Sequence, residues 1–533
     1  MKKIKYIYIV LAAIIFTSCV NDLEVTPIDP DSNNATTVFS TEEGTKGALA
    51  KIYASFAYNG QGAGEQEIQG IREDFSNFLR QYFVLQECTT EESIVAWDDQ
   101  TIKNFHWHTW QANDVFNEAV YSRLFFSVAL ANEFLRNVDN SPVSEEDKAL
   151  FVAEARFLRA FAYYIAVDFY GNIPIIDEEA SLSDLPVQAT RAEVFSFVET
   201  ELTEIESALA APQANEYGRV DRVAAWMLLG KLYLNAEVFV GEDRYSDALN
   251  YTNQVISSSY SLDPVYENVF RADNNTSPEI IFPLVYNGIH SQSHGTTFLV
   301  HASSGGGLDV ANVRGVGGSG WGGFRAVKEL PEKFGLAAGD FTLAAPLADI
   351  PDSRALFYFN SNDAWEWNVE NVGTFTEGIG VYKFSNLNSD GSQPEYYNPD
   401  FVSTDFPMFR LADAYLMYAE IFLRGGGGDA NTATGYINDL RERAYGDVSG
   451  NISNADLTLD FLLDERAREL YWEAQRRTDL IRFGKYSSGS YVWEWKGNSQ
   501  AGAGFDDYRA LFPIPAAQLT ANPNLEQNNG YSN

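Results

Sequence analysis

Apolar residues recur at helical spacing through most of the first half of the chain, and this periodicity predicts a series of amphipathic helices. Two of these helices begin at capping-box signatures, Ser40 with Glu43 and Thr190 with Glu193, in which each side chain caps the backbone of the other. The predicted helices of this half cover residues 41–58, 111–137, 145–170 and 191–210.

One helical segment carries a repeat signature. Trp226, Leu229, Gly230 and Tyr233 match the W-x2-L-G-x2-Y core of a tetratricopeptide repeat. A second helix predicted over 244–257 supplies the antiparallel partner, and the small glycine lets the two helices approach closely. The alternative is an ordinary helical hairpin. Because other predicted helix pairs flank this one, we expect a right-handed scaffold resembling an α-solenoid.

The pattern changes between residues 262 and 405, where helical periodicity is lost. Strand-like runs lie there between clusters of Gly, Ser, Asn and Asp, and these runs are EIIFPLVY, TTFLVH, ALFYF and GVYKF. Helical spacing then returns, and the predicted C-terminal helices cover residues 411–424, 430–445 and 458–483. We therefore predict a mainly α fold: a tetratricopeptide-like helical-pair scaffold with a loop-rich insertion that contains short strands.

The first residues are typical of a bacterial export signal. Lys2, Lys3 and Lys5 precede an apolar run at 7–16 that is too short for a permanent membrane span. Thr and Ser come next, directly before Cys19. A small residue before a cysteine at this place resembles a lipobox, in which the cysteine becomes the lipid-modified N-terminus. The alternative is a plain signal peptide with a chance cysteine.

These patterns predict five consecutive parts. They are a lipoprotein signal peptide (1–18), a polar lipid-anchored leader (19–38), an N-terminal helical tetratricopeptide-like region (39–261), a loop-rich insertion (262–405) and a C-terminal helical region (406–533). Loops on a rigid scaffold often carry function, so we expect the ligand-contacting residues to be concentrated in the insertion.

The amino-acid composition excludes several classes of function. The 533 residues include 37 Lys and Arg but 74 Asp and Glu, which gives a net charge of −37. Such an acidic surface repels phosphate backbones and argues against nucleic acid as a partner. Only two cysteines are present, too few for a disulfide framework. Export also argues against ATP or nicotinamide cofactors, and we expect no cofactor.

The residues offer little catalytic or metal chemistry. Asp98 and Asp99 are adjacent, and neighbours in an extended segment point to opposite faces, so they do not imply the carboxylate pair of a glycosidase. His106 and His108 would share a strand face but have no third ligand nearby, so we predict no metal site. Cys88 has no catalytic partner in its sequence context and is expected to be buried and inert.

A glycine-rich segment, GVGGSG at 315–320, satisfies the G-x-G-x-x-G spacing. It has no clear strand before it and no well-placed acidic residue after it, so a dinucleotide site is not favoured. We expect the glycines to let the backbone and Trp321 form a flat surface. Trp97 lies in a similar context, since both rings have small or polar neighbours that cannot bury them. Exposed Trp faces of this kind stack on the apolar face of a pyranose.

Longer segments carry a family resemblance. EARFLRAFAYYIAVDFYGNIPI, GRVDRVAAWMLLGKLYLNA, FPMFRLADAYLMYAE, INDLRERA, ERARELYWEAQRRTDLIRFGK and LFPIPAAQLTANPNLEQNNGY resemble, in order, the SusD/RagB family of surface glycan-binding lipoproteins of Bacteroidetes. The resemblance covers essentially the whole mature chain and is closest to the starch-binding archetype. It implies a non-catalytic protein on the outer-membrane surface that passes oligosaccharides to a SusC-like TonB-dependent transporter.

The resemblance also implies a binding site. Trp97 and Trp321 fall at stacking tryptophans of the starch-binding archetype, and Phe298 falls where the archetype has a stacking tyrosine. Arg80 matches an arginine of that site, and Gln100 stands where an asparagine bonds sugar hydroxyls. We therefore expect these five residues to bind glycan.

One departure is Val95, which occupies the place of a further Trp, so the aromatic arc has one ring fewer. Starch-type α-glucan is the first ligand that we expect. Another glycan such as a β-glucan, a surface glycoside hydrolase and the import of peptides remain as alternatives.

Overall fold

The computed structural model of the protein describes residues 34–60, 67–71, 77–181, 183–305, 308–341, 350–359 and 365–532. The predicted signal peptide, Cys19 and most of the leader lie outside these described residues. Within them, no helix combines the length and apolar character that crossing a membrane requires.

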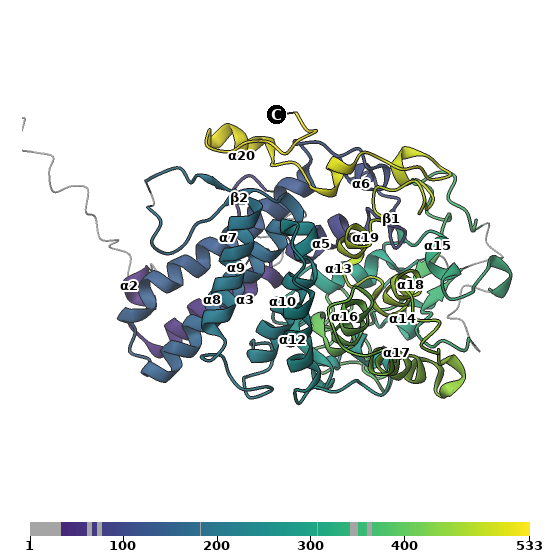
Figure 1. The fold of residues 1–533 in the computed structure, drawn as a ribbon, viewed down its shortest axis with the longest axis horizontal. Coiled ribbons are helices and arrows are strands. Elements are labelled where there is room, and N and C mark those ends of the chain that lie inside the picture. Colours follow the sequence, from purple (N-terminus) through teal and green to yellow (C-terminus); the bar gives the residue numbers. More distant parts are fainter. Residues whose placement is uncertain are drawn as a thin grey trace, which may run out of the picture.

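Helices dominate the first half of the described chain and pack as antiparallel neighbours, α7 with α8, α8 with α9, and α10 with α12 (Figure 1). The helices of this half are α2 (Ala35–Val38), α3 (Glu42–Ala57), α5 (Phe78–Glu87), α6 (Lys103–Trp107), α7 (Val115–Asn137), α8 (Glu145–Tyr170), α9 (Arg191–Ile205), α10 (Arg222–Leu234), α11 (Ala236–Val240) and α12 (Tyr245–Ile256). The short strands β2 (Ile173–Pro174) and β3 (Gln188–Ala189) pair with each other.

The helix caps show which local signals determine the boundaries. Thr190 and Glu193 form the predicted capping box of α9. The box predicted from Ser40 and Glu43 is wrong, because α3 begins one residue later. Thr41 is its N-cap and accepts a hydrogen bond from the Gly44 N–H at 3.0 Å, whereas the Ser40 hydroxyl donates to the Thr37 carbonyl instead.

The predicted tetratricopeptide-like pair is α10 with α12. A Cβ atom on Gly230 of α10 would lie 3.4 Å from Thr252 Oγ1 of α12, so the glycine sets the close approach of the two helices. Trp226 is half-buried, and its indole N–H donates to a Glu206 carboxylate oxygen at 2.8 Å.

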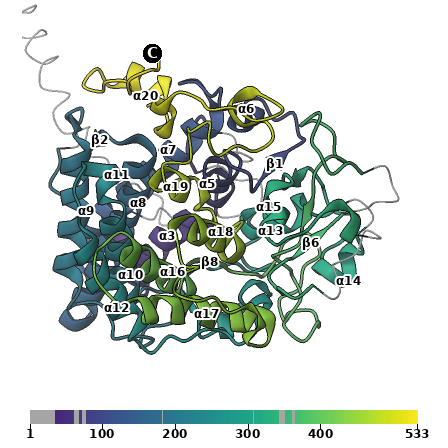
Figure 2. The same cartoon turned by 45° about the vertical axis from the view of Figure 1, so that its right-hand side comes forward.

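The middle of the chain forms short two-stranded ladders joined by loops, on the right in Figure 1 and toward the viewer in Figure 2. Its elements are β1 (Ile94–Val95) with β5 (Phe324–Arg325), β4 (Ile280–Leu284) with β8 (Phe406–Arg410), β6 (Phe357–Tyr358) with β7 (Gly380–Val381), and the helices α13 (Gly295–Ala302), α14 (Val310–Arg314) and α15 (Glu329–Glu332). The TTFLVH run is thus a helix, and the strand prediction for it is wrong. All residues of α13 are buried, including Thr296, Thr297 and His301, so the helix has no exposed polar face to reveal its period.

The C-terminal helices are α16 (Leu411–Leu423), α17 (Ala430–Tyr445), α18 (Leu459–Leu470), α19 (Arg476–Arg482) and α20 (Ala516–Ala521). The single helix predicted over 458–483 is interrupted between α18 and α19, where Trp472 has a φ of 64° and Ala474 a φ of 58°. The turn places the Trp472 indole in the core, and its N–H donates to the Glu92 carbonyl at 2.7 Å.

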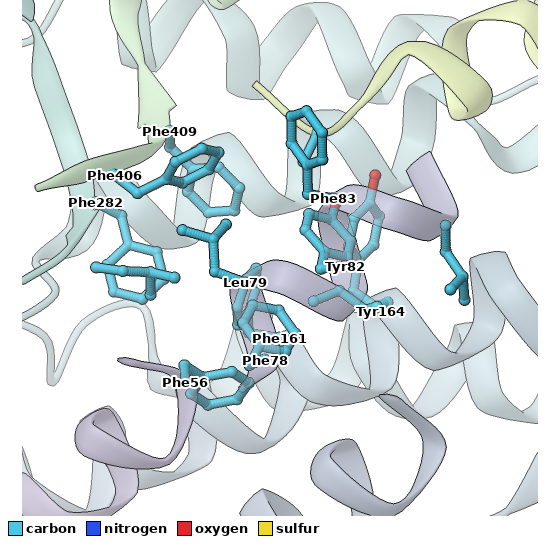
Figure 3. Close-up of a cluster of buried hydrophobic side chains, with 14 of the residues drawn as sticks. Phe56, Phe78, Leu79, Tyr82, Phe83, Phe161, Tyr164, Phe282, Phe406 and Phe409 are labelled. Atoms are coloured by element: carbon cyan, nitrogen blue, oxygen red, sulfur yellow. The ribbon is translucent and has the colours of Figure 1, made fainter. Parts of the chain in front are cut away.

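Helix α5 lies at the centre of the core, and every one of its residues is buried. Figure 3 shows Phe78 and Tyr82 of α5 beside Phe161 and Tyr164 of α8, with Phe282 of β4 nearby. The ring of Phe78 meets Phe56 of α3 edge-on at a centroid distance of 5.2 Å. The same rigid helix carries Arg80 and leads into β1, which places the next residues of the chain at the candidate site.

Candidate functional site

The pairing of β1 with β5 brings Trp97 and Trp321 together across more than 200 residues of sequence. Val95 lies opposite Phe324 in the antiparallel register, and the ladder continues with a hydrogen bond of 2.9 Å from the Ala96 N–H to the Gly323 carbonyl. The two indole rings lie 6.5 Å apart between centroids with their planes tilted by 49°. They therefore form adjacent faces of one aromatic surface.

Glycines between these rings allow the close packing. Gly320, Gly322 and Gly323 have φ angles of 72°, 63° and 101°, in the left-handed region that side chains disfavour. A Cβ atom on Gly323 would come within 2.3 Å of Trp97 Nε1. The glycine that packs against the indole, Gly323, therefore lies three residues after the G-x-G-x-x-G segment, which ends at Gly320.

Trp321 is the most exposed tryptophan of the site, with 43% of its surface accessible. The imidazole of His301 at the end of α13 stacks on its inner face at 4.7 Å with an angle of 22°. Burial lowers the pKa of His301 to about 4, so this ring is neutral at neutral pH. One indole face is therefore fixed, while the rest of the ring remains available to a ligand.

Trp97 is half-buried and rests on other aromatic rings. Phe298 meets it nearly edge-on at 5.8 Å, and Phe324 does so at 5.5 Å. Phe298 itself is 2% exposed, because α13 buries it between Trp97, Phe324 and Arg80. Phe298 therefore presents no free ring face on which a sugar could stack, in contrast to the expectation from the sequence. It packs against Trp97 instead.

The two polar residues expected at the site differ in exposure. Arg80 is buried, its guanidinium lies 4.9 Å from the ring centre of Phe298, and it pairs with Asp99 at 2.5 Å. Gln100 is exposed and has a φ of 28°. Val95 is fully buried in β1, so no side chain at this position extends the aromatic surface.

Sequence reasoning missed Phe375, which is 47% exposed. It lies in a loop across the glycine segment from Trp97 and lines a pocket of about 280 Å³ together with Trp321, Trp365 and Tyr358. The signal that could have found it is the one used for Trp321. Phe375 is a large apolar residue between Thr374 and Thr376, which cannot bury it.

The remaining candidates for chemistry are structural. His106 lies in α6 and His108 is its C-cap, so the two rings do not share a strand face. Burial lowers the pKa of each to about 3. Cys88 is buried as predicted. No group of three or more His, Cys, Asp or Glu side chains in the described part of the chain could hold a metal ion.

The structure thus combines a helical-pair scaffold with an aromatic surface that includes the exposed Trp321. Residues 357–531 match the family described as "SusD family", and residues 34–234 match the family described as "Starch-binding associating with outer membrane". The chain is 33% identical to "Starch-binding protein SusD" of Bacteroides thetaiotaomicron, over 97% of this chain and 96% of that protein. The chain therefore belongs to the SusD family.

Solved structures share this fold. A SusD superfamily protein from Bacteroides thetaiotaomicron superposes with a TM-score of 0.70 at 20% identity, over 92% of this chain and 99% of that one. Surface glycan-binding protein A from the same species, in complex with laminarihexaose, superposes with a TM-score of 0.67 at 20% identity, over 92% of this chain and 100% of that one.

Proposed function

We propose that this protein captures starch-type α-glucan, such as maltooligosaccharides, at the cell surface. The observation that carries the proposal is the tilted pair of Trp97 and Trp321, whose rings offer adjacent stacking faces to successive sugar units. Arg80 and Phe298 pack against the Trp97 ring and fix its position. Gln100 supplies an exposed amide for sugar hydroxyls. Similarity to a relative named for starch binding supports the α-glucan.

A β-glucan is the second candidate ligand. Its support is the fold shared with a glycan-binding protein solved in complex with laminarihexaose. The valine at position 95 adds to that support, because it removes one ring from the arc that the starch-binding resemblance implies.

The protein acts without catalysis in this proposal. A retaining or inverting glycosidase needs a carboxylic acid that stays protonated beside a carboxylate. The adjacent acids of the site are instead paired with cations, Asp98 with Lys103 and Asp99 with Arg80. Each of the two carboxylates is therefore engaged by a neighbouring side chain rather than poised as a pair across a scissile bond. We expect no shortening of maltooligosaccharides on prolonged incubation.

Anchoring and transfer complete the proposed role. Lipid on Cys19 would hold the protein at the outer membrane, where a SusC-like TonB-dependent transporter would receive the captured glycan. The Cys19→Ala variant should carry no acyl label and should leave the membrane fraction. Co-purification of a TonB-dependent barrel with the wild-type lipoprotein tests the partner.

Calorimetry with maltoheptaose and laminarihexaose tests the ligand. Stacking of an aromatic ring on a base contributes about 1–3 kcal/mol, and about 1.4 kcal/mol corresponds to a tenfold change in affinity. By analogy, Trp97→Ala and Trp321→Ala should each weaken maltoheptaose binding by roughly one to two decades. Trp226→Ala, which alters a half-buried Trp of the distant α10, is the control and should bind normally. Preference of the wild type for laminarihexaose would replace the α-glucan with the β-glucan.

A further inference from the structure

We propose that the binding surface continues past Trp321 to Phe375, which holds an additional sugar unit of the same chain. This inference rests on the proposed function, because it extends the Trp97 and Trp321 surface. It makes Phe375 a determinant of the length of glycan that the protein prefers.

The glycine segment separates the two ends of this extended surface. A Cβ atom added to Gly323 would point at Trp97. One added to Gly322 would instead point at Phe375 and lie 3.4 Å from Phe375 Cδ1. Adjacent residues thus face opposite rings, and Trp321 stands at the start of the same segment. A chain lying over Trp97 and Trp321 reaches Phe375 by crossing backbone that carries no side chains.

A pocket of about 280 Å³ lies on the Phe375 side of this segment. Ligand pockets in proteins begin at roughly 300 Å³, so this space suits a small group such as a single sugar ring. The aromatic part of its lining comes from Trp321, Phe324, Tyr358, Trp365 and Phe375, and the Ser319 and Thr376 hydroxyls add polar groups.

The lining also indicates a neutral ligand. Among the described residues that line the pocket, Arg325 is the only charged one, and it is 2% exposed. Its guanidinium donates to the Thr374 carbonyl at 2.6 Å and to the Val372 carbonyl at 3.2 Å. Aromatic faces with scattered hydroxyls and no accessible charge match the apolar face and hydroxyl rim of a pyranose.

The loop that carries Phe375 is held in place, so the exposure of the ring is built into the fold. Arg325, which follows the glycine segment in β5, anchors the loop through the Val372 and Thr374 carbonyls. On the other side, the Glu366 N–H donates to the Thr376 carbonyl at 2.9 Å. The same arginine therefore fixes the position of Phe375 relative to Trp321.

Chain-length dependence of binding tests the inference. Calorimetry should compare wild type, Phe375→Ala and Phe375→Tyr with maltotriose and maltoheptaose, or with laminaritriose and laminarihexaose if the wild type binds those instead. We expect Phe375→Ala to weaken binding of the longer sugar about tenfold and to leave the trisaccharide unchanged. Phe375→Tyr retains a ring and should keep the wild-type preference.

Other outcomes separate this inference from the proposed function. If Phe375→Ala weakens both lengths equally, or changes neither, while the wild type binds glucan, the extension is wrong and the proposed function stands. If the wild type binds neither glucan series, both the Phe375 extension and the proposed function are wrong. Trp226→Ala again serves as the control for a general effect of removing an aromatic ring.

Discussion

Gly323 packs its Cα directly against the indole of Trp97, since a Cβ atom at position 323 would lie 2.3 Å from Trp97 Nε1. A methyl group at position 323 must therefore displace the ring, and it also meets a φ of 101°, which costs about 1–3 kcal/mol. We predict that Gly323→Ala weakens glucan binding at least tenfold when measured by calorimetry, the effect that we also expect of Trp97→Ala.

Gly335→Ala is the matched control for this prediction. Its φ is 75°, and nothing lies within 4 Å of the position of its Cβ atom. The variant carries left-handed backbone strain without contacting the site, so it should lose stability but keep wild-type affinity. Equal affinity of Gly323→Ala and wild type would show that the position of Trp97 does not control binding.

Local signals in the sequence predicted the positions of most helices. The box of Thr190 and Glu193, and the small Gly230 opposite Thr252, need only near neighbours in sequence or one adjacent helix. The strand prediction for the TTFLVH run failed because α13 is buried on all sides and has no exposed polar face. The prediction of one continuous helix over 458–483 failed because the break at Trp472 involves a hydrogen bond to Glu92, which is 380 residues away in sequence.

The same distinction applies to the site. Trp97 and Trp321 were predicted to belong to a ligand-binding surface because their neighbours in sequence are too small or too polar to bury them. The burial of Phe298 depends on α13 packing against Phe324 and Arg80, which no local pattern encodes. Phe375 had the local signal, but its relation to the site depends on Arg325.

Acid should destabilise the protein through His106. Its Nε2 accepts the Val95 N–H at 2.7 Å, and burial lowers its pKa to about 3, against about 6.5 in the unfolded chain. Between these values only the unfolded state binds the proton. The stabilisation is therefore complete above pH 6.5 and is lost as the pH falls toward 3.

We predict that His106→Gln reduces the slope of unfolding free energy against pH by about 1.4 kcal/mol per pH unit between pH 6 and 4. Urea denaturation at several pH values measures this slope. His290→Gln, at an exposed histidine, should keep the wild-type slope. An unchanged slope in His106→Gln would mean that this histidine is protonated in the folded protein.

Salt should have little effect on binding despite the net charge of −37. Screening weakens interactions between charges, and a neutral glucan has none to screen. We predict that the affinity for maltoheptaose changes less than twofold between about 50 and 500 mM NaCl, where the screening length falls from above 10 Å toward 3 Å. A steep fall in affinity would mean that interactions between charged side chains of the protein control the shape of the site.

Charged residues of the C-terminal motifs form a buried network around Arg410, which is 1% exposed. Its guanidinium donates to Glu473 at 2.6 Å, and to Glu279 and Glu469 at 2.7 Å each. Removing one partner of a buried ion pair leaves an uncompensated charge and costs about 3–5 kcal/mol. We predict that Arg410→Met lowers the free energy of unfolding by about this amount in urea denaturation.

The exposed pair of Lys46 and Glu216 provides the comparison, because its side chains are 51% and 60% accessible. Exposed ion pairs contribute about 0–1 kcal/mol, so Lys46→Met should change stability by no more than that. The Arg410 network includes neither Trp97 nor Trp321, and folded Arg410→Met should bind maltoheptaose with wild-type affinity. A stability loss in Arg410→Met no larger than in Lys46→Met would show that the network does not hold β8 to the C-terminal helices.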